Sequence, residues 1–408
     1  MTRLLTAMIA LVAFYGQARA QISGGVVKIG VLTDMAGPWA AWAGPGSVIA
    51  TRMAVEDFTK KNGPLPFRVE VVAGDFQLKA DIATSIARDW MRNGVDVIVD
   101  VPQSGAALAV NSLLRGSSTA FLATGAQHDD LTTTECSPNT VHWTFDSSSL
   151  TVPLIQKGPR GGQNTWFFLT VDLAGGKGME AVARDAIDAA GGRTVGAVHT
   201  PVNSSDFSSF LLQAKASDAR TIGVIQGGGD LTTALKQANE FGMMSGSQTF
   251  AATFVQLSDV HALGLDVAKG LRFMEAFYWD VDDKKRTFAA AFASRSDGRY
   301  PTSVQAGAYS AVFDYLKAVV AAGSDDGPTV VSKMKTLRVD DGLFGPGEVR
   351  QDGRMVHDMF FVEAKNPAQS VGPWDLYRVL DRIPAKHAFR PMSAQCHLVG
   401  IEQTFQKE

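Results

Sequence analysis

Two loops that follow predicted strands carry the residue types best suited to holding a small ligand. One contains Trp39 and Trp42, and the other reads Thr124-Gly125-Ala126-Gln127. Exposed tryptophans are costly, so each either packs onto its own domain or forms an apolar wall for a ligand. The second loop offers free N–H groups and a hydroxyl, which can hold a carboxylate. Gln103-Ser104 adds polar groups at a predicted helix start.

The chain carries no pattern that is typical of catalysis or metal binding. Its seven histidines form no H-x-x-x-H or H-E-x-x-H pattern, so no metal site is predicted. Walker A and G-x-S-x-G sequences are absent as well. The triplet His128-Asp129-Asp130 could serve acid–base or metal chemistry, but such a triplet more often caps a helix in a loop. We therefore predict a protein that is not an enzyme and uses no cofactor.

The first twenty residues have the features of a cleavable export signal. Arg3 supplies a positive charge, an apolar run extends over residues 4–15, and Ala18-x-Ala20 is a small-residue cleavage pattern. The apolar run is too short for a membrane-spanning helix, which needs roughly 20 apolar residues. We predict cleavage after Ala20 and a mature protein that works in the periplasm.

Charge and cysteine content agree with an exported protein. The formal net charge is −3, and positive and negative residues are mixed along the chain. This charge pattern does not favour binding to nucleic acid or to an anionic membrane. In an oxidising compartment the two cysteines, Cys136 and Cys396, most simply form one disulfide, although two free buried thiols are the alternative. The bond would fasten the C-terminal tail to the first third of the chain.

A glycine-rich segment, Gly176-Lys177-Gly178-Met179-Glu180-Ala181, matches the looser G-x-G-x-x-A dinucleotide pattern. We favour a glycine-rich turn at a helix N-terminus, whose N–H groups could face a ligand anion. The segment lies in the middle of the chain, and an exported protein has no ready supply of NAD.

Strands and helices alternate along most of the chain, which predicts parallel sheets with helices on both faces. The alternation restarts after a stretch rich in proline and glycine at 137–162, which indicates two similar α/β lobes. Late amphipathic helices, a strand at 355–363 and a surface-draped tail from Pro367 complete the prediction. The predicted strands are 26–32, 67–73, 95–101 and 120–123, then 166–170, 194–199, 221–225 and 249–253; the predicted helices are 44–61, 80–93, 106–114, 179–190, 207–216, 231–241, 285–296, 303–322 and 329–337.

In order and spacing, several segments resemble the periplasmic substrate-binding proteins of branched-chain amino-acid-type ABC transporters, the Leu/Ile/Val-binding family. The resemblance covers about residues 26–399. It rests on VKIGVLTD at 27–34 before Gly37-Pro38, DVIVDVP at 96–102, FLATGA at 121–126, AGAY at 306–309 and FGPG at 344–347.

This resemblance implies a type I periplasmic-binding fold: two doubly wound parallel-sheet lobes joined by a three-segment hinge, with the ligand enclosed between them. It implies a monomer that docks on the permease of an ABC transporter. By position, Trp42 matches an aromatic residue that packs on the ligand. Gln103, Ser104, Thr124 and Ala126 match the groups that hold its carboxylate, with Gly125 between the last two.

Departures from the family pattern bear on the ligand. Amino-acid binders of this family usually place an acid after the strand predicted at 249–253, where this chain has Phe254, and an aromatic ligand loop has become Leu173-Ala174-Gly175-Gly176. An unpaired ammonium in a closed cleft would cost several kcal/mol. The sequence therefore favours an aromatic acid over an α-amino acid, unless Asp172, Asp230 or Asp259 replaces the missing acid. The added Trp39 suggests a bulky ligand.

The predicted organisation is a signal at 1–20, an N-terminal lobe at 21–147 plus 277–350, a C-terminal lobe at 148–276 plus 351–366, and a tail at 367–408 packed back on the N-terminal lobe. Two other functions stay open. One is a receptor of the same fold that signals without transport, and the other is a secreted enzyme that uses a cleft acid such as Asp172.

Overall fold

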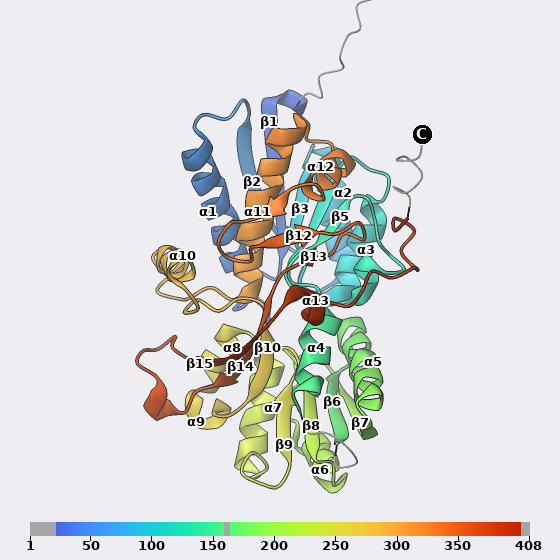
Figure 1. The fold of residues 1–408 in the computed structure, drawn as a ribbon, viewed down its shortest axis with the longest axis vertical. Coiled ribbons are helices and arrows are strands. Elements are labelled where there is room, and N and C mark those ends of the chain that lie inside the picture. The colour runs from blue at the N-terminus through green and yellow to red at the C-terminus, as the bar shows by residue number, and fades with distance from the viewer. Residues whose placement is uncertain (1–21, 159–163, 401–408) are drawn as a thin grey trace, which may run out of the picture.

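A computed structural model describes residues 22–158 and 164–400 (Figure 1). The predicted export signal lies outside the described residues. Within them the chain forms two α/β lobes, one above the other in Figure 1, and each lobe is built around its own sheet. No helix in the described part of the chain is long and apolar enough to span a membrane.

The N-terminal lobe contains a parallel sheet with the strand order β2-β1-β3-β4-β5. Strands β3 and β4 are buried at every position, as expected for strands that are covered by helices on both faces. The strands are β1 (Val26–Thr33), β2 (Arg68–Asp75), β3 (Val97–Asp100), β4 (Ala120–Ala123) and β5 (Thr140–His142); the helices are α1 (Gly44–Asn62), α2 (Ala80–Arg92), α3 (Ser104–Leu114), α10 (Asp283–Ala293), α11 (Ser303–Ala322) and α12 (Gly327–Met334).

The C-terminal lobe contains a larger mixed sheet with the order β15-β14-β10-β9-β8-β6-β7. Its first five strands along the chain pair in parallel, whereas β14 and β15 are antiparallel. The strands are β6 (Thr165–Val171), β7 (Arg193–Thr200), β8 (Thr221–Ile225), β9 (Thr249–Ala252), β10 (Arg272–Glu275), β14 (Met359–Ala364) and β15 (Tyr377–Ile383); the helices are α4 (Ser147–Gln156), α5 (Ala174–Ala189), α6 (Ser208–Ala216), α7 (Gly228–Glu240), α8 (Leu257–Leu263) and α9 (Leu265–Ala268).

The described chain passes between the lobes after β5, after β10 and between β13 (Met355–Val356) and β14. Strand β13 belongs to a small antiparallel sheet with β11 (Arg338–Val339) and β12 (Gly347–Val349). A bridge between His142 and Arg354 ties this segment to the end of β5. The alternating α/β prediction and the two-lobe fold class are confirmed.

Three details of the sequence prediction are wrong. The strand predicted at 355–363 is two strands in different sheets, because the chain leaves one lobe for the other at His357-Asp358. The helix predicted from Met179 already begins at Ala174, so the glycine-rich segment lies inside the helix. The tail from Pro367 is not only draped over the surface, since β15 extends the sheet of the C-terminal lobe.

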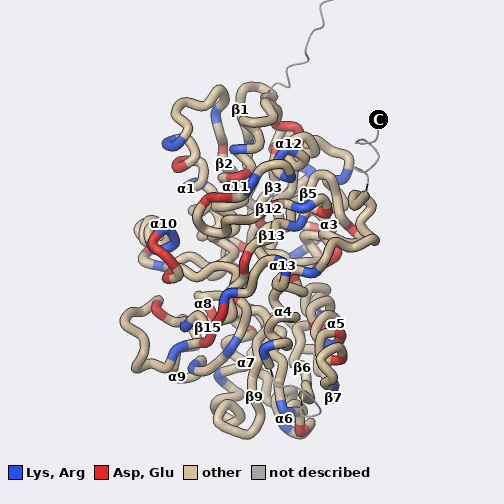
Figure 2. Tube along the Cα trace, viewed as in Figure 1, with Lys and Arg blue, Asp and Glu red and all other residues tan. Residues whose placement is uncertain are grey.

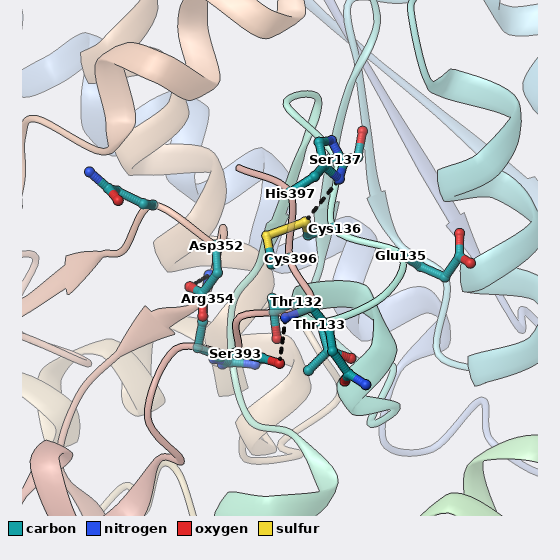
Figure 3. Close-up of a disulfide and its surroundings, with 12 residues drawn as sticks. Thr132, Thr133, Glu135, Cys136, Ser137, Asp352, Arg354, Ser393, Cys396 and His397 are labelled. Atoms are coloured by element: carbon teal, nitrogen blue, oxygen red, sulfur yellow. Dashed lines mark hydrogen bonds between the residues drawn. A yellow bond between two sulfur atoms is a disulfide. The ribbon is translucent and has the colours of Figure 1, made fainter. Parts of the chain in front are cut away.

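Beyond β15 the tail returns to the N-terminal lobe as a fourth passage between the lobes (Figures 1 and 3). Phe389 is buried and packs on the Arg354 guanidinium, 4.8 Å from the ring centroid. Arg390 donates a hydrogen bond of 2.8 Å to the Thr132 hydroxyl. Cys396 then forms a disulfide with Cys136, with 5.6 Å between their Cα atoms. The predicted cysteine pairing is confirmed.

Candidate functional site

The candidate site is a narrow cleft where the carboxyl edges of both sheets face each other. The residues that line it leave only a small internal space, and the cleft is partly open to solvent. Most of its lining residues directly follow a strand or begin a helix, where open α/β sheets bind ligands. The lining residues are Trp39, Pro102, Gln103, Ser104, Gly105 and Gln127 from the N-terminal lobe, and Val171, Leu173, Gly175, Gly176, Ile225, Gln226, Gly227 and Phe254 from the C-terminal lobe.

The N-terminal wall consists of side chains that hydrogen bonds hold in place. Gln103 caps α3, and its Oε1 atom accepts a hydrogen bond from the Ala106 amide at 2.5 Å. The Ser104 hydroxyl oxygen accepts from the Gln127 amide at 3.2 Å. The loop that carries Trp39 is fixed by the buried Asp34, whose carboxylate accepts from the Trp39 amide at 2.9 Å. These groups are therefore positioned before a ligand arrives.

The C-terminal wall is built mainly of glycines and apolar residues. Leu173 caps α5 and Gly227 caps α7, so both helices begin at the cleft. The Gln226 amide nitrogen donates to the Thr200 hydroxyl at 3.0 Å, while its Oε1 atom is buried without a partner among the described residues. Phe254 follows β9 and is 4 % exposed.

Helices α3, α5 and α7 all begin at this cleft. The first N–H groups of a helix lack partners within the helix, and the helix dipole makes this end positive. None of the described lining residues is Asp, Glu, Lys, Arg or His. The cleft therefore offers hydrogen-bond donors and positive helix ends to an anion, and no carboxylate to a cation.

The structure brings five of the predicted ligand residues to the cleft lining: Trp39, Gln103, Ser104, Leu173 and Phe254. Trp42 lies behind this wall. It is fully buried and packs on Trp39 and Phe254, with ring centroids 5.5 Å and 5.1 Å apart. Trp42 thus supports the aromatic wall from behind and belongs to the core of the molecule.

The other predicted residues lie outside the lining. The Thr124 hydroxyl donates to the buried Asp100 carboxylate at 3.0 Å, and the Ala126 carbonyl contacts Nε2 of His142 at 2.8 Å. Gly125 faces Pro102, because an added Cβ atom would lie 2.9 Å from the proline Cβ. Asp172 is half exposed and forms an ion pair with Lys177 at 2.6 Å.

The other acids considered as ammonium partners are also engaged away from the lining. Asp259 is buried and accepts a hydrogen bond from the Gln256 amide at 3.0 Å. Burial raises the pKa of Asp259 to about 7, against the lowering effect of the Gln256 and Gly228 N–H groups. Asp230 accepts from the Asn203 amide at 3.0 Å, and burial raises its pKa as well.

The triplet at 128–130 has a capping role. His128 caps the short helix Asp129–Thr132, and the Asp129 carboxylate accepts from the Ser148 amide at the start of α4, at 3.2 Å. Burial and the nearby Asp146 charge raise the pKa of Asp129 to about 7. Across the described ranges, no group of three or more His, Cys, Asp and Glu side chains is arranged to hold a metal ion.

Sequence reasoning did not name Val171, Ile225 and Gln226 as site residues. Each lies at or directly after the end of β6 or β8. The rule that ligands bind at the carboxyl edge of a parallel sheet would have found them, because those strand ends were predicted correctly.

Two α/β lobes that enclose a cleft at their facing strand ends match a known family. The family model described as "Periplasmic binding protein" matches residues 26–369. The chain belongs to the periplasmic binding protein family. The predicted family resemblance is confirmed, and proteins of this family bind small solutes and work with the permeases of ABC transporters.

Solved structures of this family from Burkholderia are similar over nearly the whole chain. A periplasmic binding protein from Burkholderia mallei is 40 % identical, with a TM-score of 0.86 over 92 % of this chain and 100 % of that one. A branched-chain amino-acid ABC transporter periplasmic ligand-binding protein from Burkholderia xenovorans LB400 is also 40 % identical, with a TM-score of 0.80 over 90 % and 99 %.

More distant relatives share the fold with various ligands. A Leu/Ile/Val-binding protein homolog 6 from Brucella melitensis is 26 % identical over 73 % of this chain and 77 % of its own length. A solute-binding protein from Rhodopseudomonas palustris BisB5, solved with 3,4-dihydroxybenzoic acid, is 20 % identical with a TM-score of 0.75 over 88 % and 98 %. The fold alone therefore does not decide the ligand of this binding protein.

Proposed function

We propose that this protein is the extracytoplasmic solute-binding component of an ABC importer. It captures a small carboxylate in the cleft between the lobes and delivers it to the permease. The observation that supports this ligand class is the meeting of three helix N-termini in a cleft whose described lining carries no charged side chain. Such a site stabilises one negative charge and provides nothing to balance a positive one.

The N-terminal wall supplies the groups that would bind the carboxylate. The Ser104 hydroxyl and the side-chain amides of Gln103 and Gln127 line the cleft beside the start of α3. The capping bond of Gln103 uses its oxygen, which leaves its amide nitrogen as a donor. Hydrogen bonds to a charged acceptor are worth about 1.5–3 kcal/mol each, so two or three of them fix the orientation of the ligand.

The remainder of the ligand faces an apolar surface, which favours an aromatic acid over an α-amino acid. Trp39 and Phe254 provide aromatic contacts, and Leu173 and Ile225 complete an apolar wall. An ammonium group here would be buried without a counter-charge, which costs several kcal/mol. The Rhodopseudomonas palustris neighbour that holds 3,4-dihydroxybenzoic acid shows that this fold accommodates such a ligand.

A thermal-shift screen of the refolded, ligand-stripped protein tests this proposal. The panel contains 4-hydroxybenzoate, 3,4-dihydroxybenzoate, leucine, a short dicarboxylate and benzamide. A ligand at 100 times its Kd adds about 2.7 kcal/mol to the free energy of unfolding. We expect stabilisation by the aromatic acids and none by benzamide, which lacks the charge. Strong stabilisation by leucine, without any by the aromatic acids, would contradict the proposed ligand class.

We also propose that the chain reaches the periplasm through its N-terminal signal, with cleavage after Ala20, and acts as a monomer. Along the described chain, Lys and Arg positions are interspersed with Asp and Glu positions in both lobes (Figure 2), a pattern that does not favour a nucleic-acid or anionic-membrane partner. The intact mass of the exported protein would show whether the mature chain starts at Gln21. Light scattering coupled to size-exclusion chromatography would report the oligomeric state.

A further inference from the structure

The first turns of α5 carry three glycines that face in different directions. Gly176 faces its own lobe, since an added Cβ atom would collide with the Val171 carbonyl oxygen. Gly175 and Gly178 face the other lobe. A Cβ atom on Gly175 would lie 2.8 Å from the Ser104 Oγ atom, and one on Gly178 would lie 2.9 Å from Nε2 of His128. Residues three apart share a helix face, so these two glycines form one surface toward the N-terminal lobe.

The residues opposite this surface are held by their own lobe. The Ser104 Oγ atom is engaged by the Gln127 amide. Nδ1 of His128 accepts from the Asp130 amide at 3.3 Å and lies 3.6 Å from the Asp130 carboxylate, and the His128 side chain is only 18 % exposed. Contacts below 3.0 Å require the neighbouring atoms to shift. The atoms here are the ends of side chains, but their hydrogen bonds and the burial of His128 restrain them, so the absence of side chains on α5 favours this close approach of the lobes.

We propose that Gly175 and Gly178 form a closure seam, a glycine surface on α5 that sets how far the two lobes close and how long a ligand is retained. This inference rests on the proposed binding function and adds a role for residues other than the ligand contacts. It also gives a reason for the glycine-rich segment, because glycines three residues apart allow the helix to approach the N-terminal lobe closely. A side chain at the seam would clash in the closed arrangement alone, because the clash disappears when the lobes separate.

Gly178 is the better position for a test, because Gly175 also lines the ligand cleft whereas Gly178 does not. The matched control is Gly229→Ala. Gly229 also lies in the first turn of a helix that begins at the cleft, but an added Cβ atom would meet no described atom within 4 Å. Ligand dissociation would be followed by stopped-flow fluorescence, with 4-hydroxybenzoate and leucine as probes.

We expect Gly178→Ala, and more strongly Gly178→Leu, to speed dissociation roughly 10- to 100-fold, the range that overpacking of this size implies. The association rate and the melting temperature of the ligand-free protein should stay close to those of the wild type. His128→Ala combined with Gly178→Ala should restore slow dissociation, because it removes the ring that the new methyl group meets. Unchanged dissociation in both Gly178 variants would overturn the proposal.

A second measurement is independent of the ligand. Cysteines at His128→Cys and Gly178→Cys should be joined by a short bifunctional thiol reagent, while either single variant gives no intramolecular product. The native disulfide is buried and does not interfere. Failure to cross-link would show that the lobes do not meet here and would refute the seam. If the cross-link forms but neither probe binds the wild type, the proposed ligand class is wrong and the seam stands.

Discussion

The N-terminal lobe lines the cleft with polar side chains that are already hydrogen-bonded, whereas the C-terminal lobe lines it mainly with glycines, apolar residues and helix starts. In the proposed function, Ser104 and Gln103 select a carboxylate by direct hydrogen bonds. In the same proposal, Leu173, Gly227 and Phe254 cover the ligand and exclude water. The difference indicates a division of labour, in which one wall orients the ligand and the other encloses it.

The largest expected effect concerns the covalent bond that joins the tail to the N-terminal lobe. Replacing both Cys136 and Cys396 by serine removes a cross-link with a sequence separation of 260 residues. The chain-entropy model gives about 5.5 kcal/mol for a loop of this order, and measured losses are typically 2–5 kcal/mol. Denaturant unfolding of the variant against the oxidised wild type checks this prediction, and the reduced wild type should match the variant. A loss below about 1 kcal/mol would show that noncovalent contacts alone hold the tail on the N-terminal lobe.

The two tryptophans are expected to have different roles: Trp42 supports the cleft wall from the core, and Trp39 contacts the ligand. Trp42→Ala deletes a fully buried core side chain, which should cost about 3–5 kcal/mol of folding stability. Trp39→Ala, at the cleft surface, should weaken 4-hydroxybenzoate binding while it changes the melting temperature of the ligand-free protein less than Trp42→Ala does. Calorimetric titration and thermal unfolding of both variants test this contrast. Equal melting temperatures would place Trp42 at the surface instead of in the core.

Buried acids also distinguish the two lobes. Asp100, at the end of β3, accepts a side-chain hydrogen bond from Thr124, and burial raises its pKa to about 6. Burial raises the pKa of Glu275, at the end of β10, further, to about 8, although the Ser303 hydroxyl donates to it. Its second carboxylate oxygen is buried without a partner among the described residues.

The raised pKa of Glu275 predicts a pH-dependent stability. The folded state holds this proton more tightly than the unfolded chain, so its stabilising effect is complete below pH 4.5 and is lost as the pH rises toward 8. Glu275→Gln should remove a stability difference between pH 5 and pH 8 on the order of 2–4 kcal/mol. Urea unfolding at both pH values, for wild type and variant, measures it. Identical pH slopes would show that Glu275 keeps an ordinary pKa.

The smallest effect is expected at Asp172, which the sequence offered as one of three acids that could pair a ligand ammonium. Its carboxylate is half exposed and paired with Lys177, which lowers its pKa. Asp172→Asn should leave the affinity for 4-hydroxybenzoate unchanged within about twofold, since exposed ion pairs contribute little. A large loss of affinity would show that the Asp172 carboxylate takes part in binding. It would then favour an amino-acid ligand or a cleft enzyme.

The sequence predicted the long elements well because their apolar patterns are local. It missed β5 and β10, which are three and four residues long and end where the chain leaves a lobe. It also missed β11 and β12, which are two and three residues long. Strands this short contain too few positions for an alternating apolar pattern to be recognised.

The candidate site was predictable as a location but less so residue by residue. The strand ends identified Gln103 and Ser104 correctly as lining residues. Thr124 matched the family position, yet its hydroxyl is occupied by Asp100, a partner in the neighbouring strand. Trp42 packs on Phe254 from the other lobe, a contact that becomes visible only when both lobes are placed together.

The disulfide also has a consequence for the order of events when the protein is made. The loop that it closes begins before α4 and ends after β15, so it encloses the whole described C-terminal lobe. Because Cys396 follows β15, the bond can form only after both lobes have been synthesised. The bond is therefore a late step, and thiol labelling of newly made chains would show when it closes.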